Sequence, residues 1–230
     1  MKHFIIDFET IGQNSREVPA IDCSYTVFDW ERFTSDNPYS FKELVLNMEY
    51  AKFDIKDQMV NHGCKYSERD LQWWLDQPAE LRTNMKPNPE LDLKSDQFVD
   101  KLIDYLQQKG NISYWWSRSN SFDPVILERI AQNAGRLEKL GAYLKWWSVR
   151  DTRTYIDAKF NFDVPGKKNG FIPVSNIEKW EYNFKAHDSK HDVAADVLRL
   201  QTIVRAEADL EPEAGIFLLF WAGAPSFAWL

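Results

Sequence analysis

Two acidic residues end the first apolar segment of the chain, where residues 4–10 read FIIDFET. An unbroken apolar run of this kind predicts a strand that is buried on both faces and reaches the surface at its carboxyl end. Because strand side chains alternate, Asp7 and Glu9 share one face, roughly 7 Å apart, and Phe8 faces the other way. Two neighbouring carboxylates repel each other unless a cation lies between them, and hard oxygen ligands suit Mg²⁺ or Mn²⁺. The pair predicts a divalent-cation site, although a strand that simply ends in solvated acids explains these two residues equally well.

A third acidic residue, Asp123, directly precedes a helical pattern of apolar residues. It follows the short apolar segment 112–117, which predicts a strand. A carboxylate between a strand and a helix lies at the same kind of sheet edge as Asp7 and Glu9. A plain helix N-cap followed by Pro124 at the first helical position explains the same sequence, and the two roles can coexist.

Histidines and acids gather in residues 186–196, AHDSKHDVAAD, which run into an amphipathic helix. Two pairs have a histidine followed five positions later by an aspartate: His187 with Asp192, and His191 with Asp196. The helix dipole disfavours the charged form of a histidine near the N-terminus, which keeps the ring available as a base near neutral pH. Either histidine alone would be an ordinary surface residue. Together with acids at predicted strand and helix ends, the cluster indicates a catalytic site.

The elements expected to hold these residues form an α/β chain. After the first strand, the pattern predicts a second strand over Ala20–Asp29 and a third around 41–47, so antiparallel strands open the fold. Helical spacing predicts one capped helix that begins near Ser67 and ends before Pro78, and another from Ser95 to Lys109. The latter helix lies between two predicted strands, which indicates a crossover and a parallel pair.

Length and composition favour one domain. With 230 residues, 44% of them hydrophobic, the chain can bury one sizeable core. The formal charge of −7 argues against binding nucleic acid through an overall positive field, but it leaves room for a local basic track. The two cysteines, Cys23 and Cys64, form no C-x-x-C motif and follow no signal peptide, so we expect buried thiols in a reducing cytosol.

Tryptophans and arginines give less specific signals. The ten tryptophans lie largely in pairs, at 73–74, 115–116 and 146–147. Such residues are more often core than base-stacking platforms, although a protein that binds single strands would expose some of them. Arg150 and Arg153 flank a carboxylate, and residues 166–170 predict an exposed basic loop. These cations could contact phosphates, and surface salt bridges explain them about as well.

Three segments form an ordered set along the chain: residues 7–10 (DFET), residues 121–123 (SFD), and a histidine with an aspartate five positions later. This set resembles the motifs of the DEDDh 3′-to-5′ exonucleases, a family with a ribonuclease H-like fold. The chain is further similar to the phage exodeoxyribonuclease A type and its bacterial exoribonuclease relatives, through residues 4–10, Trp73-Trp74 with Gln77, and residues 150–154 and 186–192. The resemblance implies an α/β fold in which helices flank a mixed central sheet.

The resemblance also implies the roles of the site residues. Four carboxylates, those of Asp7, Glu9, Asp123 and Asp192, would hold two Mg²⁺ (or Mn²⁺) ions, and His187 would be the general base. We favour the pair His187 and Asp192, because the family commonly has a small residue two places after the histidine, as at Ser189, and because His187 lies on the loop side of the helix. The pair His191 and Asp196 remains the alternative.

The implied partner is single-stranded nucleic acid with a free 3′ end, with DNA preferred over RNA, and the products are nucleoside 5′-monophosphates. An exoribonuclease of the same fold and a catalytically inactive nucleic-acid-binding relative are the alternatives. Phe8 or Trp74 could wedge or stack against the terminal base. A cytoplasmic location follows, in the host cytoplasm if the chain is encoded by a phage.

The chain is expected to divide into an exonuclease domain, residues 1–210, and an apolar C-terminal tail, residues 211–230. No charged residue lies between Ala214 and Leu230. The stretch contains Gly223 and Pro225 and falls short of the roughly 20 apolar residues that a membrane-spanning helix needs. We therefore expect no membrane segment.

Overall fold

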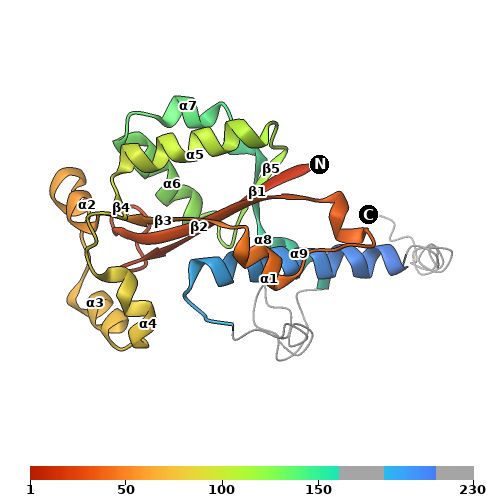
Figure 1. Ribbon diagram of the computed structural model, residues 1–230, viewed down its shortest axis with the longest axis horizontal. Coiled ribbons are helices and arrows are strands. Elements are labelled where there is room, and N and C mark those ends of the chain that lie inside the picture. Colours follow the sequence, from red (N-terminus) through yellow and green to blue (C-terminus); the bar gives the residue numbers. More distant parts are fainter. Residues whose placement is uncertain (161–183, 211–230) are drawn as a thin grey trace, which may run out of the picture.

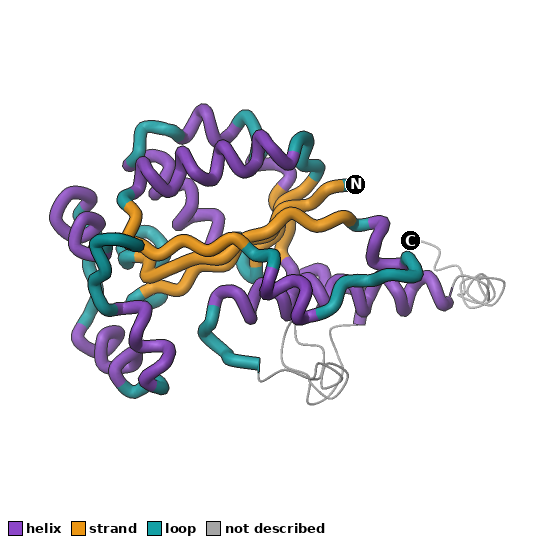
Figure 2. Tube along the Cα trace, in the orientation of Figure 1, coloured by secondary structure: helices purple, strands orange, loops and turns teal. Residues whose placement is uncertain are grey.

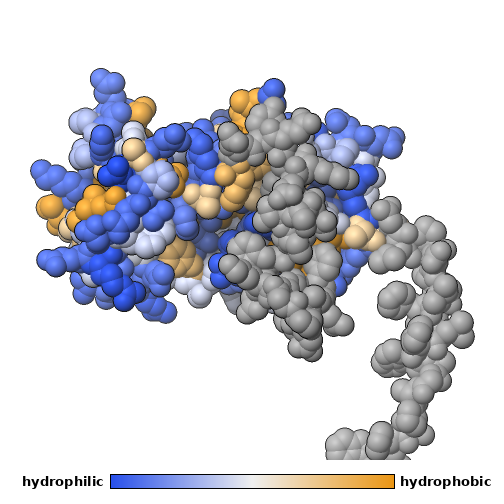
Figure 3. All heavy atoms as spheres, turned by 90° about the horizontal axis from the view of Figure 1, so that it is seen from below, coloured by the Kyte–Doolittle hydropathy of each residue, from blue (hydrophilic) through white to orange (hydrophobic). Residues whose placement is uncertain are grey.

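The structure, a computed structural model, describes residues 1–160 and 184–210 (Figures 1 and 2). The predicted basic loop at 166–170 and the predicted tail at 211–230 lie outside these residues. Within the described part, no helix is both long and apolar enough to cross a membrane. The face seen from below is mainly hydrophilic, with smaller hydrophobic patches between (Figure 3).

A six-stranded mixed sheet forms the centre of the molecule, with the order β4-β3-β2-β1-β5-β6. β1 pairs antiparallel with β2 and parallel with β5; the predicted parallel pair is present, but β5 pairs with β1 rather than with the strand that precedes it in the chain. β2–β3 pairing is antiparallel, and the β3–β4 and β5–β6 pairs are parallel. The strands are β1 (Lys2–Thr10), β2 (Ala20–Asp29), β3 (Glu49–Phe53), β4 (Asp92–Leu93), β5 (Tyr114–Ser117) and β6 (Val149–Asp151).

Helices cover both faces of the sheet (Figure 1). One layer holds α5 (Ser95–Lys109), α6 (Asp123–Asn133) and α7 (Leu137–Gly141), and the opposite layer holds α1 (Phe41–Leu46), α8 (Thr152–Phe160) and α9 (Ser189–Leu210). At one end lie α2 (Ile55–His62), α3 (Glu68–Leu75) and α4 (Ala79–Arg82). Short 3-10 turns are η1 (Glu31–Thr34), η2 (Thr83–Met85) and η3 (Trp146–Ser148).

β1 is buried on both faces, as its apolar sequence predicts. Phe4, Ile6 and Phe8 belong to the core cluster beneath α5 and α6, whereas Ile5 belongs to the cluster beneath α9. Side chains alternate along a strand, so Asp7 and Glu9 follow Ile5 on the α9 face. The predicted division of β1, acids on one face and Phe8 on the other, is confirmed.

The third predicted strand was wrong: residues 41–46 form the helix α1, and the third strand is Glu49–Phe53. Ser40 caps the helix by accepting a hydrogen bond from the Glu43 backbone N–H at 3.2 Å. Phe41 and Leu44 then lie three residues apart on the face buried with α9. The segment has the apolar spacing of a helix turn, and the cap at Ser40 marks its start.

The helix predicted near Ser67 is confirmed as α3, with a capping box between Ser67 and Asp70. The helix predicted from Ser95 to Lys109 is α5. Both cysteines are buried and free, as expected. The paired tryptophans differ in burial. Trp74 and residues 115–116 are buried, but Trp73, Trp146 and Trp147 are 43%, 79% and 61% exposed.

Trp74, on α3, bonds the group of helices α2, α3 and α4 to the end of β1. Its indole Nε1 donates a hydrogen bond to the Thr10 carbonyl oxygen at 2.8 Å, one residue beyond Glu9. The side chain is 3% exposed and packs with Ile11 and Ile21. Trp74 is therefore a structural residue, and its predicted role in base stacking is wrong. Phe8, 4% exposed and packed against Phe53 and Phe98, is excluded for the same reason.

We expect Trp74→Phe to lower the free energy of unfolding by about 1–3 kcal/mol, because it removes a buried hydrogen bond and leaves a cavity. Urea unfolding measures this as a lower midpoint with an unchanged slope. The matched control is Trp73→Phe, next in sequence but half exposed, which should change the free energy by less than about 0.5 kcal/mol. Equal losses in the two variants would contradict the structural role of Trp74.

Candidate active site

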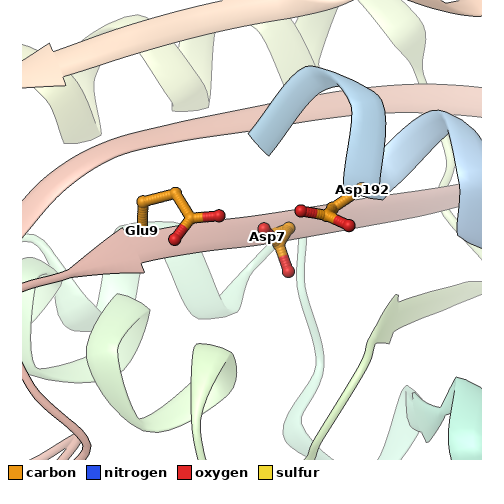
Figure 4. A group of neighbouring side chains, drawn as sticks. All are labelled: Asp7, Glu9 and Asp192. Carbon is orange, nitrogen blue, oxygen red and sulfur yellow. The ribbon is translucent and has the colours of Figure 1, made fainter. Parts of the chain in front are cut away.

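Three of the predicted acids meet where α9 begins above β1. Single carboxylate oxygens of Asp7, Glu9 and Asp192 all lie within 4.8 Å of one another. Asp7 and Glu9 reach this point from one face of β1, and Asp192 reaches it from the first turn of α9 (Figure 4). The three side chains converge although Asp192 is far from the other two in sequence. Their oxygens are spaced as the ligands of one cation would be.

Asp123 lies beside this trio but is not one of the three acids that share the 4.8 Å limit. It is 2% exposed, and its Oδ1 accepts a hydrogen bond from the Phe8 backbone N–H at 3.0 Å. This contact ties the first turn of α6 to the peptide that follows Asp7. The N-cap interpretation is wrong, because Asp123 is the first helical residue and Phe122 is the cap.

Asp196, one turn after Asp192 on α9, has both carboxylate oxygens engaged by protein groups. Oδ1 accepts from Arg118 at 2.6 Å and from Arg199 at 2.5 Å, and Oδ2 accepts from the Thr152 hydroxyl at 3.0 Å. The side chain is almost fully buried. Asp196 therefore joins α9 to the loop after β5 and to α8.

His187 lies directly beside the trio. Its backbone N–H donates to Asp192 Oδ2 at 2.9 Å, and its φ of +64° places the residue in the left-handed region. The imidazole packs edge-on against Trp73, with 4.9 Å between ring centroids. Neither ring nitrogen bonds to a described residue. Partial burial lowers the pKa of His187 below its usual value, so the ring is neutral near pH 7.

The second histidine, His191, is held by its surroundings. Its Nδ1 accepts a hydrogen bond from the Lys185 backbone N–H at 3.0 Å. Its ring packs at right angles against Phe41, with the centroids 5.2 Å apart. One ring nitrogen of His191 is thus occupied, in contrast to His187, although both rings pack edge-on against an aromatic ring.

Burial and mutual repulsion raise the pKa values of the clustered carboxyls. The pKa values of Asp7 and Glu9 lie well above their usual range, first because both groups are buried and then because other acids surround them. Burial raises the pKa of Asp123 and that of Asp192 to about 7, and the charge of Asp196 adds to both. A divalent cation would remove this penalty, and carboxylate oxygens suit Mg²⁺ or Mn²⁺. The donor set thus fits such a metal.

A buried polar network that the sequence analysis missed holds α9 in place. Asp22 on β2, opposite Glu9 in the sheet, accepts from Ser189 Oγ at 2.6 Å and from Asn84 Nδ2 at 3.0 Å. Ser189 also shares a hydrogen bond with Ser24 Oγ at 2.8 Å. Burial raises the pKa of Asp22 to about 6. The available signal was the polar residues at 22 and 24, which alternate with apolar residues along this strand.

We expect the metal-free protein to lose stability as the pH rises from 5 to 8. Folded Asp123 and Asp192 keep their protons up to about pH 7, whereas the unfolded chain releases them near pH 4. The native state binds more protons in this range, so stability falls as pH rises through the folded pKa values. Thermal unfolding in EDTA measures this loss, because the unfolding midpoint should fall by about 2–4 °C for each kcal/mol of stability lost.

Millimolar Mg²⁺ should reverse most of that loss at pH 8, because a cation that binds only the native state stabilises it by mass action. The same unfolding series with Mg²⁺ in place of EDTA tests this. A metal-free midpoint that rises toward pH 8, or a midpoint at pH 8 that Mg²⁺ leaves unchanged, would contradict the electrostatic account of the cluster.

Comparison with known proteins identifies the family. Residues 2–204 match the family described as the 3′-5′ exoribonuclease Rv2179c-like domain. The chain is 32% identical over 227 residues to a protein named exodeoxyribonuclease from Enterobacteria phage T4, and the match covers 92% of each chain. Its fold is similar to that of E. coli exonuclease I, solved in a zinc-bound form with single-stranded DNA and with a dT13 oligonucleotide, with TM-scores of 0.56 and 0.55 at 14% identity.

The match to exonuclease I covers 95% of this chain, which spans only 43% of the E. coli protein. It confirms the predicted ribonuclease H-like arrangement, a mixed sheet flanked by helices. The exonuclease activity follows from the match to the family and from the similarity to the phage protein. The chain is therefore an enzyme of the DEDDh type of 3′-to-5′ exonucleases and belongs to the Rv2179c-like family.

Proposed function

We propose that the enzyme hydrolyses single-stranded DNA from its 3′ end, releases nucleoside 5′-monophosphates, and uses two divalent cations. The observation that carries this proposal is the convergence of Asp7, Glu9 and Asp192 within 4.8 Å, with Asp123 bonded to the peptide after Asp7. The phage relative is named an exodeoxyribonuclease, and the E. coli structures hold single-stranded DNA. Both support DNA as the substrate.

Asp7, Glu9, Asp123 and Asp192 would hold the metal ions. Bound there, the ions would activate a water, stabilise the charge that builds on the scissile phosphate and orient the leaving 3′ oxygen. The carboxylates are mounted on a buried strand and on two helix starts, so they stay in place while the substrate binds and leaves.

His187 would accept the proton of the attacking water. Its backbone N–H bonds to Asp192, its ring is neutral near pH 7, and neither ring nitrogen bonds to a described residue. His191 and Asp196 make a weaker pair, because Asp196 is bonded to Arg118, Arg199 and Thr152 and one nitrogen of His191 is occupied. These contacts favour the pair His187 and Asp192.

RNA is the second candidate substrate, because the family description names an exoribonuclease. The ribose 2′-hydroxyl is the group that distinguishes the two polymers. The catalytic arrangement proposed above would serve either one, since the metals would act on the phosphodiester and His187 on the attacking water.

We expect Asp7→Asn to reduce hydrolysis of 5′-labelled single strands by more than about 100-fold, because it removes one charged metal ligand. The assay uses DNA and RNA of the same sequence with Mg²⁺ or Mn²⁺, and a ladder that shortens from the 3′ end reports the polarity. DNA should be degraded faster than RNA.

The matched control is Asp104→Asn, an exposed acid on α5, which should retain parental activity. Thermal unfolding should show Asp7→Asn to be folded, since the change relieves repulsion in the metal-free site. Full activity of a folded Asp7→Asn protein would exclude the acidic trio as the active site. If RNA is digested faster than DNA, RNA rather than DNA is the substrate.

Alanine substitution distinguishes the two histidines. We expect His187→Ala to lower kcat by about 10²–10⁴-fold, the usual contribution of a general base, and His191→Ala to lower it by less than about 10-fold. Because His191 packs against Phe41, the unfolding midpoint of each variant should be measured beside its kinetics. A larger loss of kcat in a folded His191→Ala protein would assign the base to His191.

A further inference from the structure

A cavity of about 500 Å³ lies on the α9 side of the sheet, outside the acidic trio. Its walls come from β3, from the segment 83–91 after α4, and from the start of α9. α4 and the first turn of α9 lie on the same side of the sheet (Figure 1). The volume falls within the roughly 300–1,000 Å³ typical of ligand sites.

The lining of the cavity combines lysine ammoniums and one carboxylate, that of Asp188, with flat apolar surface. Lys86 and Lys190 line it, and within the described residues neither forms an ion pair. The Lys190 ammonium lies 5.1 Å from the centre of the Tyr50 ring. Pro87 and Pro89 add apolar surface. Lysine ammoniums bind phosphates, and a tyrosine ring is a surface against which a base can stack.

A buried ion pair keeps this wall in place. The Lys52 ammonium bonds to Asp92 on β4 and donates to the Lys86 carbonyl oxygen at 2.8 Å. Both side chains of the pair are less than 10% exposed. Lys52 is therefore neutralised and structural, and it fixes the backbone of Lys86 at the cavity.

The cavity is joined to the active site through bonded residues. Asp188, which lines it, directly follows His187 in sequence. Asn84, which also lines the cavity, donates to Asp22, which is paired with Glu9 on the adjacent strand and accepts from Ser189. The cavity and the acidic trio thus share the start of α9, with Asp188 lining the cavity and Asp192 in the trio.

We propose that this cavity binds a nucleotide upstream of the two that the scissile bond joins, with Lys86 and Lys190 on its phosphate and Tyr50 against its base. The inference rests on the proposed function and extends it from the cut phosphate to the strand that leads away from it. It also assigns a local basic track to a chain whose formal charge is −7. Phosphate and base contacts of this kind favour longer strands without reading their sequence.

The test is a length series of single strands, from a dinucleotide to an octanucleotide of dT, digested by the parent, Lys86→Ala and Lys190→Ala. We expect each substitution to lower kcat/KM on the octanucleotide by about 5- to 10-fold and to leave the dinucleotide unchanged. The dependence of log KM on log salt for the octanucleotide should lose about 0.7 of slope per lysine. Lys56→Ala, an exposed lysine on α2, is the matched control and should behave as the parent.

If the parent is active and both lysine variants show the same dependence on strand length as the parent, the inference is overturned and the proposed function stands. Equal losses on the dinucleotide and the octanucleotide overturn it too, since the lysines would then act at the scissile bond. So does a change that appears only in inhibition by free dTMP, since the cavity would then bind released product. A parent that cleaves no strand contradicts the proposed function and the inference together.

Discussion

Repulsion among partly buried carboxylates is the constraint that the rest of this structure must withstand. Asp7, Glu9 and Asp192 lie within 4.8 Å of one another, and their pKa values are raised because the groups are buried and crowded. Nothing in the trio itself favours the assembled state before a cation binds. The scaffold must therefore supply the stability, and it does so through a strand buried on both faces and through polar contacts that fasten α9 to the sheet. Packing and hydrogen bonds outside the trio therefore keep its three carboxylates in position to bind a cation.

The two acids on α9 show how the structure assigns opposite tasks to similar residues. Asp196 is surrounded by Arg118, Arg199 and Thr152, so its charge is compensated within the protein and it serves as a joint. Asp192, one turn earlier, accepts only the backbone N–H of His187 among the described hydrogen bonds and keeps an oxygen for the site. Removing one partner of a buried ion pair leaves the other charge uncompensated. Asp196, which is paired with two arginines, therefore cannot exchange roles freely with Asp192. The histidines differ in a similar way: a ring nitrogen of His191 accepts a hydrogen bond from Lys185, whereas His187 bonds to Asp192 through its backbone.

Prediction from sequence succeeded where local and tertiary preferences agree. The apolar run before Asp7, the capping box at Ser67 and the regular helix at 95–109 each carry a signal within a few residues, and each forms the expected element. It failed at residues 41–46, where an apolar segment was assigned to a strand, because six residues do not separate a buried strand from a short helix by periodicity alone. It also missed Asp22, whose importance depends on Ser189, Asn84 and Glu9, three residues brought to it by folding.

The sequence by itself determined which chemical groups this protein has and in what order: alternating acids on a buried strand, an acid at a helix start, and a histidine five positions before an aspartate. Those features are local, since they follow from side-chain alternation and helix-start preferences. Only the tertiary structure decided which aspartate on α9 is neutralised by arginines, which tryptophan of the pair 73–74 is buried, and which lysines share a cavity with a tyrosine ring. These outcomes depend on contacts between residues far apart in the chain, and spacing along the sequence does not encode the distance between their side chains.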